Sequence, residues 1–326
     1  MAAWLCLALF QGAFAAAAFS AEEAGGDSDL PLSLLQTRTY QTCTYTGAAE
    51  EVAPLQRLQT IPETIPEIAR PSRLAVFVQA ANASLFADAR RCVEQVAAAQ
   101  VVLAGTTNVF VAALNHADAA RFSKEMEYLP AQVTVEVFQN RGADVGLFLQ
   151  QLQGRPLNYD FILKIHTKSS NVLREHALSQ LCGDTDVVKQ VLAHFHAEPR
   201  LQMVGPQGLV LENASDFSTI ERLWDDRNVK FALWPWEERA AEVRAWPLLS
   251  GKHFPHRNSW TIMATNFYWM RSTSLACCGR LLRVIPELVA TMPFGYVTGS
   301  SAQMCHVLER LIPTMVRASG GIVAEI

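Results

Sequence analysis

The chain has 326 residues, of which 50% are hydrophobic and 18% charged. This composition supports a substantial core and excludes a disordered or fibrous protein. Lysine and arginine total 27 against 31 aspartates and glutamates, a formal net charge of −4, which disfavours nucleic acid as a partner. The seven cysteines are too few for a disulfide scaffold, and their spacing matches no zinc motif, so a structural zinc is not indicated. We expect no cofactor.

The N-terminal segment is mostly apolar, and residues 2–20 carry no charge. We interpret residues 1–21 as a signal peptide or a short anchor, with cleavage favoured, although no basic residue precedes the apolar run. The expected location is the lumen of the secretory pathway (ER or Golgi) or the exterior, and membrane association is expected only if the segment stays uncleaved. A cytoplasmic protein with a misassigned start is the remaining alternative.

The cysteines bear on this location. Loss of Cys6 with a signal peptide leaves six of the seven cysteines, an even number that permits disulfides in an oxidising lumen. Cys92 lies on the apolar face of an expected helix, where a buried thiol is as good an interpretation as a disulfide. Asn82 and Asn213 each begin an N-glycosylation acceptor pattern, which supports a lumenal location only weakly.

The remaining chain divides into a linker and one domain. Residues 22–71 are rich in proline, with no sustained apolar period, and are interpreted as a linker or stem. From 72 to 326, apolar strand candidates alternate with helical patterns at 85–96 and 186–196. The sequence therefore predicts an α/β, Rossmann-type, mostly parallel sheet with helices on both faces and a ligand site at its carboxyl edge. The expected strands are 74–78, 101–103, 109–112, 133–138, 161–165 and 201–204.

Polar side chains cluster where the expected strand 161–165 ends. Strand alternation places Lys164, His166 and Lys168 on one side of the chain. Amines in or beside a buried strand need an anionic partner. That partner is either a ligand phosphate or a carboxylate of the fold, such as Asp144 or Glu309, and the sequence leaves both open.

A second polar segment, 140–144, follows the expected strand 133–138 and opens an apolar helix. Gly142 permits a tight backbone path, and the guanidinium of Arg141 suits a phosphate. Asp144 is suited to capping the helix, an interpretation that we favour over catalysis on sequence grounds alone.

Five segments of the proposed domain form an ordered set: NRGADVGLFL (140–149), YDFILKIHTKSS (159–170), MVGP (203–206), MATNFYWMR (263–271) and CHVLERL (305–311). In this order they resemble motifs of the rhamnan synthesis protein F family. The resemblance spans roughly residues 74–320 and implies a GT-A-like glycosyltransferase of polysaccharide synthesis.

The resemblance implies transfer of a hexosyl or deoxyhexosyl group, rhamnosyl among them, from a nucleotide-diphosphate sugar to a glycan acceptor. The comparable metal position of GT-A enzymes holds cations here, so we expect a metal-independent reaction in which they stabilise the departing diphosphate. The expected catalytic residues are Asp144, His166 and His256, and the expected donor-binding residues are Asn140, Arg141, Lys164, Lys168, Thr265 and Asn266.

Two departures from the family pattern weaken the expectation of catalysis. Ala143 stands where members commonly carry a second arginine, and no acidic residue occurs between Glu287 and Glu309, where members tend to have one. A direct-displacement transferase needs a base for the acceptor hydroxyl, and the candidates left are Asp144, His253, His256 and His306. The alternative is a degenerate, non-catalytic protein of the same fold that binds a glycan or a nucleotide sugar.

Overall fold

The computed structural model describes residues 56–58, 71–212, 261–277, 282, 285–292, 294–295 and 304–326. All of them belong to one compact unit, Gln41–Ile326. The expected signal or anchor (1–21) and nearly all of the expected linker (22–71) lie outside the described residues. Within the described residues, no helix combines the length and the apolar character that a bilayer crossing requires.

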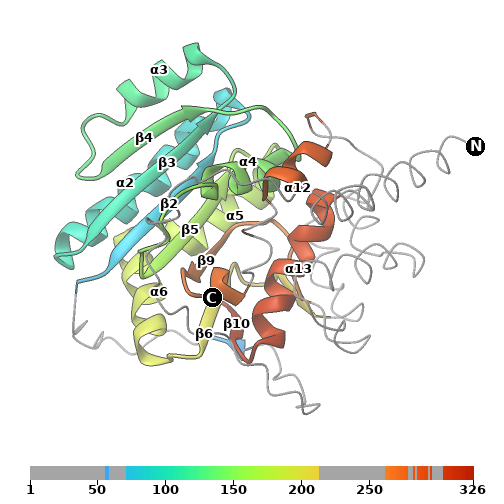
Figure 1. Ribbon diagram of the computed structural model, residues 1–326. Coiled ribbons are helices and arrows are strands. Elements are labelled where there is room, and N and C mark those ends of the chain that lie inside the picture. The colour runs from blue at the N-terminus through green and yellow to red at the C-terminus, as the bar shows by residue number, and fades with distance from the viewer. Residues whose placement is uncertain are drawn as a thin grey trace, which may run out of the picture. The chain divides into compact units, whose positions relative to one another are not determined.

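The sheet runs in the order β1-β10-β6-β9-β5-β2-β3-β4 (Figure 1). Its strands are β1 (Gln56–Arg57), β2 (Arg73–Gln79), β3 (Thr106–Ala113), β4 (Gln132–Val137), β5 (Phe161–His166), β6 (Leu201–Gly205), β9 (Tyr268–Arg271) and β10 (Ile322–Glu325). A separate antiparallel pair is formed by β7 (Val210–Glu212) and β8 (Thr261–Met263).

Within this sheet only β9 runs against its neighbours, β5 and β6, and all other pairs are parallel. The expected mostly parallel α/β sheet is thereby confirmed. Parallel strands bring their carboxyl ends to one edge, so the turns after β2 and β5 lie side by side.

The helices and short helical turns between the strands are η1 (Ala83–Leu85), α2 (Phe86–Val102), α3 (His116–Glu125), α4 (Ala143–Leu152), α5 (Asn171–Cys182), α6 (Thr185–Ala197), α10 (Ser274–Cys277), α12 (Ile285–Thr291) and α13 (Met304–Ala318). On one face of the sheet α2, α5 and α6 pack together, and on the other α4 contacts α12 and α13 (Figure 1). Helices therefore cover both faces, as predicted.

Strand alternation explains how both faces become apolar. Val76 and Leu163 belong to the core cluster that also contains side chains of α2, α5 and α6. Phe77 points to the opposite face, where its ring lies 5.0 Å from that of Phe110 and 5.4 Å from that of Phe148 on α4.

One expected strand, 101–103, is wrong. Val101 and Val102 form the last residues of α2, and both are largely exposed, at 60% and 68%. The helix ends at the following turn, where Ala104 has a φ of 53°, and the strand begins only at Thr106. A short apolar run cannot be assigned to strand or helix by periodicity alone.

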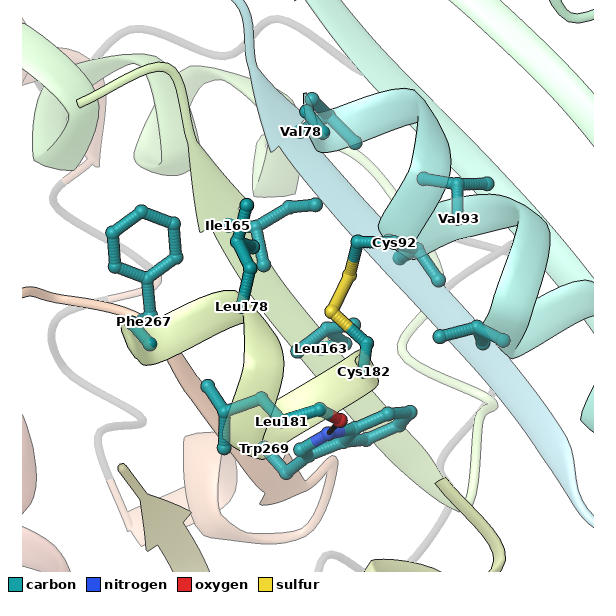
Figure 2. Packing of buried hydrophobic residues seen from close by; sticks show 14 of the residues in the cluster. Val78, Cys92, Val93, Leu163, Ile165, Leu178, Leu181, Cys182, Phe267 and Trp269 are labelled. Atoms are coloured by element: carbon teal, nitrogen blue, oxygen red, sulfur yellow. Dashed lines mark hydrogen bonds between the residues drawn. A yellow bond between two sulfur atoms is a disulfide. The ribbon is translucent and has the colours of Figure 1, made fainter. Parts of the chain in front are cut away.

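A disulfide joins the helices on one face of the sheet. Cys92 on α2 bonds to Cys182, the last residue of α5, across 90 positions of sequence. Figure 2 shows the bond inside the apolar cluster near Trp269, whose indole Nε1 donates to the carbonyl of Leu181 at 3.0 Å. Of the two interpretations that the sequence left open for Cys92, the structure therefore has the disulfide.

Part of the expected linker belongs to the sheet. Gln56 and Arg57 form β1 and pair in parallel with β10. The Arg57 guanidinium contacts the Glu325 carboxylate at 2.9 Å. The fold therefore includes a short strand from the expected linker, which the proline-rich composition around it did not predict.

Candidate functional site

Two turns with unusual backbone geometry meet near the carboxyl end of β5. Gly142, the N-cap of α4, and Ala143, its first residue, have φ angles of 67° and 50°, and Asn266, in the turn before β9, has a φ of 57°. A positive φ is unfavourable for residues with a Cβ, and such backbones cluster at functional sites. The structure thereby joins two of the segments that carry the family resemblance.

The Asp144 carboxylate links these two turns. Its Oδ2 accepts hydrogen bonds from Lys164 Nζ at 2.8 Å and from Asn266 Nδ2 at 2.5 Å, and His166 Nε2 lies 3.8 Å away. Gly142, rather than Asp144, occupies the N-cap of α4, and no side chain caps the helix there. The capping role favoured from sequence is therefore wrong, because the carboxylate is directed to β5 and to Asn266.

Lys164 is buried, with only 1% of its side chain exposed. Its ammonium also donates to the Asn266 carbonyl at 3.0 Å and lies 5.7 Å from the ring centres of both Phe148 and Tyr268. Of the two partners considered from sequence, a ligand phosphate or an internal carboxylate, the structure has the carboxylate of Asp144. Burial lowers the pKa of Lys164, while attraction to Asp144 and, more weakly, Glu309 opposes that shift.

Nearby cations keep the Asp144 carboxyl charged, and burial keeps the His166 ring neutral. Burial by itself would raise the pKa of Asp144, but His166, Lys164 and Lys168 together hold it well below its ordinary value. Burial lowers the pKa of His166 to about 4, so its ring is neutral at pH 7. Because a carbonyl can only accept, Nε2 carries the proton and donates to the Thr265 carbonyl at 2.9 Å.

Lys168 differs from Lys164 in its surroundings. It is half-buried at the turn between β5 and α5, and its charge contributes to the lowered pKa of both Asp144 and His166. β5 ends at His166, so the expected placement of Lys168 on the same side as Lys164 and His166 stays a prediction. Among the described carboxylates, none forms an ion pair with the Lys168 ammonium.

Arg141 and Asn140 stand at the other side of the Gly142 turn. Arg141 Nη1 donates to the carbonyls of Ala290 and Met292 at 3.3 and 3.2 Å, and its guanidinium stacks 3.7 Å from the ring centre of Phe294. This guanidinium is occupied in holding Ala290, Met292 and Phe294 against the turn. Binding of a donor by Arg141 or Asn140 stays a prediction.

Polar oxygens without partners lie in both turns. The Thr265 hydroxyl is fully buried, and neither it nor the Asn140 Oδ1 has a hydrogen-bond partner among the described residues. Within that same part of the chain, no group of three or more histidine, cysteine or acidic side chains is arranged to hold a metal ion. His253 and His256 lie outside the described residues, and the side chain of His306 does too.

Sequence reasoning missed Arg174, which is 4% exposed and contacts the main chain of Lys168. The spacing of residues along α5 could have identified Arg174. Arg174, Leu178 and Leu181 are spaced by four and three residues on α5, so Arg174 is a charged residue on the apolar side of the helix. A cation at such a position requires internal partners.

No curated protein matches the chain. A solved structure of core-mannan synthase A from Aspergillus fumigatus, in its Mn/GDP form, is similar with a TM-score of 0.31 and 10% identity, covering 66% of this chain and 65% of that one. The chain thus spans just under two thirds of that protein, and a likeness this weak supports no conclusion about activity.

The family comparison is more extensive. The profile described as rhamnan synthesis protein F matches residues 70–319, which include both turns of the site and the whole of β5 and α5. Because this match covers more than half of the sequence, the chain belongs to the rhamnan synthesis protein F family.

Proposed function

We propose that the protein is a GT-A-like glycosyltransferase that uses a nucleotide-diphosphate sugar and a glycan acceptor. The observation that carries the proposal is the Asp144, Lys164 and Asn266 cluster, which lies in family-matched segments near the carboxyl end of β5. Ligands of open parallel α/β sheets bind at this edge. Membership of a family named for rhamnan synthesis supports sugar transfer as the chemistry.

We assign binding of the donor diphosphate to Lys168. Lys168 is half-buried, its charge lowers the pKa of Asp144, and it has no carboxylate ion-pair partner among the described residues, whereas Lys164 is paired with Asp144. We assign Lys164 and Asn266 to holding Asp144 in place. Binding of the donor by Thr265 stays a prediction, because its hydroxyl is buried. The cation beside the leaving diphosphate would then perform the role that a divalent metal has in other enzymes.

The transferred group and the compartment complete the proposal. Transfer of a hexosyl or deoxyhexosyl group, rhamnosyl among them, is supported only by the family name. The Cys92–Cys182 disulfide supports folding in an oxidising compartment, in agreement with the signal or anchor proposed at residues 1–21. Location in the secretory lumen or outside the cell is therefore part of the same proposal.

A second function is favoured by the chemistry of the candidate bases. An effective general base has a pKa near the working pH, whereas the pKa of Asp144 is far below its ordinary value and that of His166 is about 4. His256 remains as the expected base, and it lies outside the described residues. A non-catalytic protein that binds a nucleotide sugar or glycan is accordingly the alternative.

A donor-hydrolysis assay separates the two functions. The purified full chain is incubated with a panel of nucleotide-diphosphate sugars, with and without EDTA, and release of nucleoside diphosphate is measured. Donor-dependent release that survives EDTA and is lost in His256→Ala supports a metal-independent transferase. Binding of a donor in calorimetry without release supports the non-catalytic alternative, and absence of both refutes the donor site.

A further inference from the structure

The buried guanidinium of Arg174 holds the turn between β5 and α5. Arg174 Nη1 donates to the carbonyl of Lys168, and Nη2 donates to Oδ1 of Asn171, each at 2.5 Å. Its Nε contacts the Asp88 carboxylate on α2 at 2.8 Å. With 5% of its side chain exposed, Arg174 therefore connects the main chain of Lys168 to a neighbouring helix.

Thr167 fixes the same turn from the other side. Its amide donates to the Gln79 carbonyl at 3.1 Å, and its hydroxyl accepts from the Asn82 amide at 2.8 Å. The Lys168 amide donates back to the His166 carbonyl at 3.0 Å. The backbone on both sides of the Lys168 side chain is thus constrained, although Lys168 stands outside regular secondary structure.

Lys168 and Lys164 differ in how deeply they are buried and in whether they have a counterion. Lys164 is 1% exposed and has Asp144 as its counterion. Lys168 is half-buried, and its ammonium forms no ion pair within the residues that the structure describes. A cation in a fixed position binds phosphate oxygens at a smaller entropic cost than one on a mobile loop.

We propose that Arg174, anchored by Asp88, is a positioning residue that fixes the β5–α5 turn so that Lys168 binds phosphate oxygens of the donor. This inference rests on the proposed function and specifies which cation contacts the ligand. Arginine suits the task because its planar fork donates in several directions at once, whereas a lysine ammonium cannot reproduce the fork. The partners of the fork are the Lys168 carbonyl, Asn171 and Asp88.

A double-mutant cycle on ligand affinity tests the inference. Calorimetry measures binding of uridine diphosphate, guanosine diphosphate and inorganic pyrophosphate to the full chain and to Lys168→Ala, Arg174→Met and the double variant. Loss of one charge-assisted hydrogen bond lowers affinity about tenfold or more, so we expect that loss in each single variant. Because Arg174 acts through Lys168, the double variant loses no more than Lys168→Ala.

Two further variants distinguish positioning from general stability. Arg174→Lys keeps the charge beside Asp88 and is expected to recover folding stability in urea without recovering affinity. Arg200→Met is the matched control, because Arg200 is 70% exposed and pairs with Glu198, and it is expected to change neither. Hydrogen exchange at 167–171 is expected to quicken in Arg174→Met and to stay unchanged in Lys168→Ala.

The outcomes that overturn the inference are distinct. Independent, multiplicative losses for Lys168 and Arg174, or full affinity in Arg174→Met, refute the positioning role while leaving the donor site intact. Unaltered affinity in Lys168→Ala removes Lys168 as the ligand cation. Failure of the unsubstituted chain to bind any of the probes refutes the proposed donor site, and the inference with it.

Discussion

The buried ion pair between Asp144 and Lys164 predicts that losing one partner destabilises the protein more than losing both. Removing one partner of a buried pair leaves an uncompensated charge, which costs about 3–5 kcal/mol. The side chain of Asp144 is 20% exposed and that of Lys164 only 1%, so the lysine suffers more from loss of its partner. We expect Asp144→Ala to lower the free energy of unfolding by about 3 kcal/mol.

The second substitution should then restore stability. Lys164→Met removes the stranded charge and places an unbranched apolar chain near the rings of Phe148 and Tyr268. Replacing a whole buried pair by apolar residues is often close to neutral. We therefore expect the double variant to be more stable than Asp144→Ala alone, by about 2 kcal/mol.

Urea unfolding of the two single variants and the double variant, with the disulfide intact, measures the coupling. The pair of Asp186 and Lys189, 2.9 Å apart with the Asp186 side chain 72% exposed, is the matched control, and its coupling should stay below about 1 kcal/mol. Additive effects at Asp144 and Lys164 would show that the pair is solvated in solution, and the reasoning about this site would be refuted.

Three other predictions follow from the same structure. Replacing Cys92 and Cys182 by alanine opens a loop of 90 residues and should cost about 4–5 kcal/mol in unfolding free energy; equal stability with and without reductant would contradict the bond. Because the pKa of His166 is lowered to about 4, the unfolded chain binds the proton more tightly. Stability should therefore fall by about 3 kcal/mol as pH drops from 6.5 to 4, and a His166→Gln variant that keeps the whole slope would disprove the buried neutral ring. In Gly146→Ala the new Cβ would collide with the Arg141 carbonyl oxygen, so thermal unfolding should show a loss of about 1–3 kcal/mol, and an unchanged melting temperature would contradict this packing.

The chain determines much of its fold locally. The apolar runs that became β2, β3, β4, β5 and β6, and the helical patterns of α2 and α6, are all recoverable from periodicity. The run at 101–103 failed because three apolar residues fit the end of a helix as well as a strand. The pairing of Gln56 and Arg57 with β10 depends on a partner more than 260 residues away, which no local pattern encodes.

The sequence likewise predicts one part of the candidate site, and the tertiary structure decides the rest. Alternation along β5 already placed Lys164 and His166 on one side, and the turn at Gly142 was evident from residue type. Only the packed structure decided that Asp144 is the counterion of Lys164, and that Arg174 holds the turn of Lys168. Sequence states that a buried amine needs an anion, but the identity of that anion is fixed by which side chains the tertiary packing brings within about 3 Å.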